Sequence, residues 1–154
     1  MDASETDSGG LRLRVAFGSG WGVGITFKPV AESQTHPDGS VDLAGARRVK
    51  VILDAPAGIR FSMGLQESGH GPAYEQTYAG YAGADGESYT TPEVTTVEGR
   101  QTYTFRLDEM SLSPSYGNQR GNSRIDTPAI AQCHLFFPGN QATSTLLFLS
   151  IEFD

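Results

Sequence analysis

The sequence contains a single cysteine, Cys133, among 154 residues. It therefore cannot form an internal disulfide, and it lacks the ligands of a multi-cysteine zinc site. Lys28 and Lys50 are the only lysines among 11 basic residues, and the formal net charge is −7. Nucleic-acid binding and attachment to anionic lipid both require an excess of basic residues. We therefore expect no nucleic-acid partner and no membrane partner.

Long apolar runs and helical periodicity are also missing. No apolar run approaches the roughly 20 residues that span a bilayer, and no segment keeps helical spacing for more than two turns. Residues 1–10 are polar and lack the basic and apolar regions of a signal peptide. We expect 1–10 to be a flexible tail and 11–154 a single domain, excised from a larger secreted protein.

Apolar and polar residues instead alternate with period two, the pattern of a strand with one buried face. Six segments show it: 11–17, 22–27, 48–54, 59–66, 102–107 and 146–153. A seventh strand is expected at 130–137, which is apolar on both parities apart from Gln132 and His134. Many strands without crossover helices predict an all-β fold, an antiparallel β-sandwich. A jelly roll fits better than an immunoglobulin domain, because the Cys…Trp…Cys spacing is absent.

Three connections, 28–46, 67–100 and 108–128, are too long for hairpin turns. Loops of this length in a compact domain are usually functional or disordered. The second holds four of the six tyrosines, whereas disordered linkers are poor in aromatic residues. We therefore expect these loops to flank a functional site.

Motifs for catalysis are weak. The glycine-rich run 18–24 joins two strands instead of a strand and a helix, so it is not a dinucleotide fingerprint. The histidines lack zinc-site spacing, and the strands offer no inward pair of carboxylates for glycoside hydrolysis. A jelly-roll lyase using Arg60, His134 and Tyr116, or a hydrolase acting in the same cleft, stays open as the alternative function.

The composition favours binding of a neutral glycan. Aromatic rings can stack on sugar rings, and amide and guanidinium groups can bond sugar hydroxyls. The net charge of −7 disfavours an acidic polysaccharide. An interaction domain that uses the same face for a protein is a third possibility, which would require a contiguous apolar patch.

The order of several motifs resembles that of carbohydrate-binding modules with the galactose-binding-like jelly roll, such as the family 11 modules of β-glucanases. The resemblance spans about 11–153 and rests on Gly20-Trp-Gly22, Val41-Asp-Leu-Ala-Gly45, Val49–Leu53, Ile59–Met63, Gln101–Leu107, Ile130–Gln132 and Leu149–Phe153. It implies non-catalytic binding of a plant-type β-glucan chain (cellulose, mixed-linkage glucan or xyloglucan) in an open cleft. It also implies a covalently linked glycan-degrading enzyme, an extracellular location and a monomer.

The resemblance is incomplete at two points. Such modules usually begin with an acidic strand and often close with Asp-Asp-Ile-Glu-Phe, whose acids help to hold a structural calcium. Here only the polar tail precedes Leu11, and Leu149-Ser150 stands in place of the two acids. Because calcium needs six to eight oxygen ligands, we expect no cofactor and no metal site.

Successive jelly-roll strands tend to alternate between the two sheets. The first, third, fifth and seventh predicted strands then share one sheet, and the second, fourth and sixth share the other. The outward face of the first sheet is charged, whereas that of the second is small and rich in amides. The second face is the predicted binding face, with Arg60, Gln66, Glu67, Tyr74, Tyr78, Tyr81, Tyr116, Asp126, Gln132 and His134 as candidate ligand-binding residues.

Two further residues carry expectations about packing. Trp21 shares parity with Val23 and Ile25, so we expect its ring to pack inward. Cys133 shares parity with Leu135 and is expected to be a buried, inert thiol.

Overall fold

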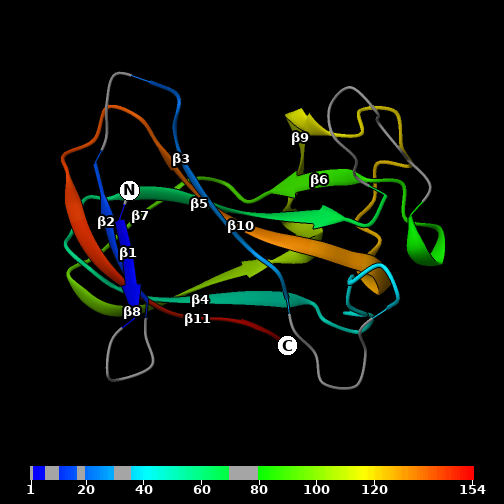
Figure 1. The fold of residues 1–154 in the computed structure, drawn as a ribbon, viewed down its shortest axis with the longest axis horizontal. Helices are drawn as coiled ribbons and strands as arrows, with labels where there is room; N and C mark the ends of the chain where they lie inside the picture. Colours follow the sequence, from blue (N-terminus) through cyan, green and yellow to red (C-terminus); the bar gives the residue numbers. More distant parts are fainter. Residues whose placement is uncertain (1, 6–10, 17–19, 30–35, 70–79) are drawn as a thin grey trace.

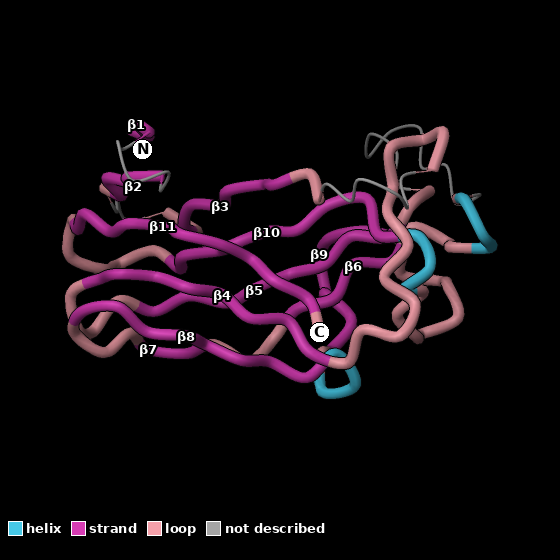
Figure 2. The backbone as a smooth tube through the Cα atoms, turned by 90° about the horizontal axis from the view of Figure 1, so that it is seen from below, coloured by secondary structure: helices cyan, strands magenta, loops and turns pink. Residues whose placement is uncertain are grey.

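The computed structural model describes residues 2–5, 11–16, 20–29, 36–69 and 80–154, and its strands form two facing antiparallel sheets (Figures 1 and 2). The first sheet has the order β1 (Asp2–Glu5), β2 (Leu11–Val15), β11 (Ser144–Phe153), β4 (Arg48–Ala55), β8 (Gly99–Arg106). The second has the order β3 (Gly22–Phe27), β10 (Ile130–Pro138), β5 (Arg60–Glu67), β6 (Glu87–Thr90), β9 (Ser111–Gly117). A short strand, β7 (Val94–Thr95), pairs with the start of β5.

The all-β sandwich is confirmed, and each of the seven predicted strands is present in the predicted sheet. Alternate apolar side chains from both sheets meet in one core. Leu13 and Val51 enter it from the first sheet, and Met63 and Leu135 from the second, all fully buried. Among the described residues, no helix is long and apolar enough to cross a membrane.

The long connections contain more regular structure than the sequence predicts. β6 and β7 lie within 67–100 and β9 lies within 108–128, together with the 3-10 helices η1 (Tyr81–Gly83), η2 (Leu107–Glu109) and η3 (Thr127–Ala129). β6 and β9 escape detection because neither has a clear apolar alternation. β9 is an edge strand, where a proline such as Pro114 is tolerated.

The predicted flexible tail is corrected at Asp2–Glu5, which forms strand β1. It pairs antiparallel with β2, with Asp2 opposite Arg14 and Glu5 opposite Leu11. Backbone hydrogen bonds to an open sheet edge require no apolar side chains, so composition alone could not indicate this strand.

Cys133 is only 2% exposed, as expected of a buried thiol. Burial raises the pKa of this thiol to about 12, which keeps it protonated and unreactive.

Candidate functional site

The best-defined candidate site is the outward surface of β10, flanked by β3 and β5 (Figure 1). The side chains that project there alternate along β10, and residues with short side chains lie opposite His134 and Phe136 on both neighbouring strands. We call this surface the β10 face; it comprises Gln132, His134 and Phe136 of β10, Gly24 and Thr26 of β3, and Ser62 and Gly64 of β5. The small neighbours leave the ring of Phe136 40% exposed.

His134 lies in the middle of the β10 face. Its Nδ1 lies 3.1 Å from the hydroxyl of Thr26 across the β3–β10 pair. The ring of Tyr116, from β9, meets the His134 ring edge-on, with the two centroids 5.6 Å apart. Tyr116 is 43% exposed, so much of its ring is accessible. The structure therefore brings together Gln132, His134 and Tyr116, three of the predicted binding residues.

The prediction that Trp21 packs inward is wrong, because its side chain is 93% exposed. Gly22, the next residue, has a φ of +135° that interrupts the alternation, so the parity of Val23 does not extend back to Trp21. A Cβ on Gly22 would lie 2.8 Å from the ring of Phe136, which shows how closely that ring approaches Gly22. Trp21 is therefore next in the chain to Gly22, the residue on which the ring of Phe136 packs.

The candidate residues chosen from the sequence did not include Trp21 and Phe136, the exposed aromatic residues at one end of the β10 face. A signal was present for both. Phe136 continues the period-two series of Gln132 and His134, and a tryptophan between two glycines at a strand start has no fixed parity.

Arg60 lies at the end of β5 nearest to Trp21. Its guanidinium forms an ion pair with Glu93 at 3.2 Å and donates to the carbonyl of Gly139 at 3.4 Å. Gly139 in turn donates its N–H to the carbonyl of Trp21 at 3.2 Å. Arg60 therefore borders the aromatic end of the β10 face, with its charge already paired to a loop carboxylate.

Gln66 and Glu67 are both fully buried, so the prediction that they contact a ligand at the surface is corrected. The Gln66 amide donates to the carbonyls of Gly86 and Glu87 at 2.9 and 3.0 Å. These contacts attach the end of β5 to the start of β6. Composition could not reveal this burial, because the covering residues lie about 20 positions further along the chain.

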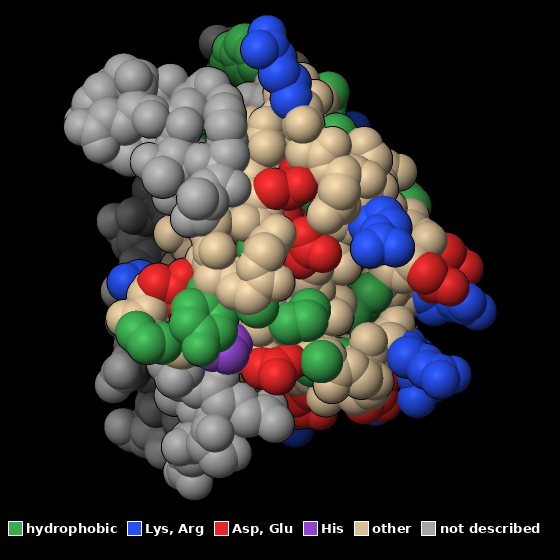
Figure 3. All heavy atoms as spheres, turned by 90° about the vertical axis from the view of Figure 1, so that its right-hand side faces the viewer, with side chains coloured by type: hydrophobic (Ala, Val, Ile, Leu, Met, Phe, Trp, Pro, Cys, Tyr) green, Lys and Arg blue, Asp and Glu red, His purple; other side chains and the backbone are tan. Residues whose placement is uncertain are grey.

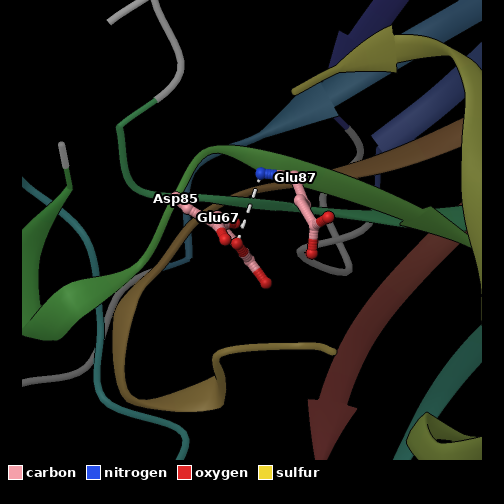
Figure 4. Close-up of side chains that lie close together, drawn as sticks. All are labelled: Glu67, Asp85 and Glu87. Atoms are coloured by element: carbon pink, nitrogen blue, oxygen red, sulfur yellow. Dashed lines mark hydrogen bonds between the residues drawn. The ribbon is translucent and has the colours of Figure 1, made fainter. Parts of the chain in front are cut away.

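Glu67 belongs to a group of carboxylates, which we call the acidic cluster: the buried Glu67 and Glu87 and the half-buried Asp85 (Figure 4). One carboxylate oxygen from each of the three residues lies within 4.8 Å of the others. Gly121 packs directly against them, since a Cβ there would lie 2.5 Å from an oxygen of Asp85. Oxygens at this spacing are the type of ligand that a hard divalent cation takes.

Most carboxylate oxygens of the acidic cluster already accept hydrogen bonds from donors of the chain. Backbone N–H groups of Asp126 and Glu87 donate to the two oxygens of Glu67, at 2.7 and 3.2 Å. Glu87 accepts from the N–H of Ser123 and the hydroxyl of Tyr89, and Asp85 accepts from the N–H of Asn122. Five of the six oxygens therefore accept hydrogen bonds, which is typical of a structural cluster that fixes a loop.

Burial, followed by the nearby Asp85 and Asp126, raises the pKa of Glu67 to about 8. A protonated Glu67 carboxyl can donate to Asp85, whose Oδ1 is buried and has no other donor within the described part of the chain. Burial and the contact with Glu87 also raise the pKa of Tyr89. In this geometry, a proton can balance part of the charge of the acidic cluster.

The remaining predicted residues lie away from the β10 face or outside the described residues. Tyr81, in η1, stacks on His36 with centroids 3.9 Å apart. Asp126 accepts a hydrogen bond from Asn122 at 2.8 Å and lies beside the acidic cluster. Tyr74 and Tyr78 fall outside the described residues.

Searches against protein-family models and against curated proteins find no match for this sequence. Solved structures do match. A family 11 carbohydrate-binding module from Clostridium thermocellum, in complex with a β-1,3-1,4-mixed-linked tetrasaccharide, aligns with a TM-score of 0.66 and 13% identity over 99% of this chain and 79% of that one. The family 11 module of the cellulosomal cellulase Lic26A-Cel5E of Clostridium thermocellum aligns with a TM-score of 0.64 and 13% identity, over 97% and 78%.

An agarase, AgWH50C, also matches, with a TM-score of 0.58 and 13% identity, over 98% of this chain and 21% of the agarase chain. At identities this low, the structural matches establish the fold alone. The resemblance noted in the sequence is thereby confirmed at the level of architecture: the chain has the β-jelly-roll fold of the family 11 carbohydrate-binding modules.

Proposed function

We propose that the protein is a non-catalytic module that binds a neutral plant-type β-glucan along the β10 face. The observation that carries the proposal is the set of exposed rings at this face: Trp21 and Phe136 toward one end, and Tyr116 beside His134. Exposed rings offer apolar surfaces on which the C–H faces of sugar rings can stack.

The rest of the β10 face suits a neutral ligand. Gln132 supplies an amide for hydroxyl groups, and Gly24 leaves open space beside Phe136, since a Cβ there would meet no atom within 4 Å. The seven residues of the face include no acid and no lysine or arginine. Cellulose, mixed-linkage glucan and xyloglucan all present equatorial hydroxyls and flat ring faces, and we propose a ligand of this group.

The similar structures support a role for this module within a larger glycan-degrading protein. One similar module is bound to a mixed-linked tetrasaccharide and another is part of a cellulase. In the agarase, the similar region makes up about a fifth of the chain. We therefore propose that the module is an extracellular monomeric unit of a larger glycan-degrading protein, and that it directs the attached enzyme to its substrate.

The geometry favours binding over a lyase reaction. Arg60 lies four residues along β5 from Gly64, the residue opposite His134, which is roughly 13 Å in a strand. Arg60 is also paired with Glu93. A base at His134 and a neutralising cation at Arg60 would therefore not act on one sugar ring.

Affinity electrophoresis and calorimetry with mixed-linkage glucan, xyloglucan, hydroxyethylcellulose and agarose test the proposal. We expect binding to at least one glucan, with no release of reducing ends or unsaturated products. Trp21→Ala and Phe136→Ala should each weaken binding at least about 10-fold, or about 1.4 kcal/mol. Val97→Ala is the matched control, because Val97 is an exposed apolar residue away from the β10 face.

Binding to none of the glucans would overturn the proposal, and so would turnover of any of them. Selective binding to agarose would keep the binding role but replace the ligand. An equal loss of affinity in Val97→Ala would show that the β10 face is not the site.

A further inference from the structure

A second concave site lies at one end of the sandwich, away from the β10 face. A cleft of about 1010 Å³ opens there between the two sheets. The start of β4, the end of β8 and the last residue, Asp154, form one wall, and the segment 123–127 forms the other. This volume is at the upper end of the range of small-molecule sites. None of the lining residues belongs to β3, β5 or β10.

The interior of the cleft is partly apolar. Leu107 and Tyr89, which are 6% and 4% exposed, line it together with Met110 and Ile125. The hydroxyl side chains of Ser123 and Thr127 contribute to the same lining. A surface that mixes apolar patches with hydroxyl groups suits a sugar ring, which has C–H faces and a polar rim.

The charges of the cleft contrast with those of the whole chain. Four arginines and two aspartates line it, so the lining itself carries two more positive than negative charges, in a protein with a net charge of −7. Two further carboxylates lie behind the lining: Glu109, 3.4 Å from Arg106, and Glu87, which accepts hydrogen bonds from Tyr89 and Ser123. The basic lining residues are Arg47, Arg48, Arg106 and Arg124. Figure 3 shows several basic side chains along one flank of this end of the molecule.

Two of these arginines are already neutralised. Arg48 binds Asp154 through Nε and Nη2 at 3.0 and 3.1 Å. Arg106 binds Asp108 through Nε and Nη2 at 2.9 and 2.6 Å. Arg47 and Arg124, in contrast, have no acidic partner within the part of the chain that the structure describes.

We propose that this cleft is a second glycan site that binds an acidic sugar through Arg47 and Arg124. The planar guanidinium forms paired hydrogen bonds with oxyanions, and carboxylate and sulfate are two oxyanions that acidic polysaccharides carry. Arg47 and Arg124 lie on different segments of one cleft, which the half-buried apolar side chains of Met110 and Ile125 also line. The β10 face and this cleft then differ in ligand charge, neutral for one and anionic for the other.

Heteronuclear NMR titration of the whole chain tests this inference, with trigalacturonate as the carboxylate probe and a sulfated carrageenan oligosaccharide as the sulfate probe. Methyl-esterified trigalacturonate and the desulfated oligosaccharide are the uncharged comparators. We expect amide shifts in 45–48, 106–110 and 123–127 with a charged probe, and at least 10-fold weaker binding of its uncharged form. Whichever charged probe binds identifies the oxyanion.

Arg47→Ala and Arg124→Ala should each weaken binding of the charged probe at least 10-fold. Arg100→Ala is the matched control, because Arg100 is an exposed arginine on β8 outside the cleft. Phe136→Ala should leave this binding unchanged, which separates the cleft from the β10 face. The inference is overturned if neither charged probe binds at 10 mM, if the uncharged forms bind equally well, or if Arg100→Ala matches Arg47→Ala.

Discussion

At the scale of single residues, Gly22 determines the geometry of the aromatic end of the β10 face. A Cβ on this residue would lie 2.3 Å from the carbonyl oxygen of Phe137 and 2.8 Å from the ring of Phe136, and its φ of +135° is unfavourable for other residues. Gly22→Ala should therefore lower the free energy of unfolding by about 1–3 kcal/mol and weaken glycan binding by displacing Phe136. Urea denaturation and calorimetry measure the two effects.

Gly24→Ala is the matched control, since a Cβ on Gly24 would meet no atom within 4 Å. Its free energy of unfolding should stay within about 0.5 kcal/mol of the wild type. Equal destabilisation by the two substitutions would contradict the role given to Gly22.

Glu67 makes the stability of the fold depend on pH. Its pKa is about 8 in the folded protein, whereas the ordinary value is 4.5, so the folded state holds a proton that the unfolded chain releases. The contribution of this group to stability is therefore complete below pH 4.5 and is lost as the pH rises through 8. The side chain at position 67 cannot ionise in Glu67→Gln. The free energy of unfolding, measured by urea denaturation between pH 5 and 9, should therefore decline less with rising pH for this variant than for the wild type.

Glu152→Gln, an exposed substitution on β11, should leave the wild-type pH dependence unchanged. If the free energy of unfolding falls equally with pH in the wild type and in Glu67→Gln, the pH dependence does not arise from Glu67. A large rise in the wild-type unfolding midpoint on adding calcium at pH 8 would also contradict the assignment, because a cation would then take the place of the proton.

At the scale of elements, β1 is the strand that composition hides. It lies at the edge of the first sheet and pairs only with β2 among the described strands. Deleting residues 1–5 should lower the melting temperature by a few degrees, because the backbone pairing of Asp2–Glu5 with β2 is lost. Glycan binding should be unchanged, since the β10 face belongs to the other sheet. Thermal denaturation and affinity electrophoresis of the truncated chain test both statements, and lost binding would contradict the second.

The elements also show which parts of the fold the sequence could predict. Strands with a clear apolar alternation, such as 11–17 and 48–54, could be placed and assigned to sheets, because each buries one face in a shared core. β6 has the sequence Glu-Ser-Tyr-Thr, and its burial depends on Glu67 and the segment 121–126, which are distant in the chain. The burial of Glu67 was unpredictable for the same reason, whereas Gln132 and His134 could be placed from strand parity alone.

At the scale of the whole molecule, the two proposed glycan sites should respond differently to salt. Binding of a neutral glucan at the β10 face involves no change in charge pairing, so its affinity should change less than about twofold between 50 and 500 mM NaCl. Binding of an acidic sugar at the arginine-lined cleft should weaken several-fold over the same range, because salt screens exposed charges. Calorimetry with both ligands at both salt concentrations checks this, and equal salt dependence would contradict the separation.

The position of β10 within its sheet has a consequence for the thermodynamics of recognition. This strand is hydrogen-bonded on both sides, to β3 and to β5, over most of its length. The side chains of the β10 face therefore project from backbone that is already ordered before a ligand arrives. A sugar chain that binds there orders few protein dihedral angles, so the entropic cost of association arises mainly from the sugar chain itself.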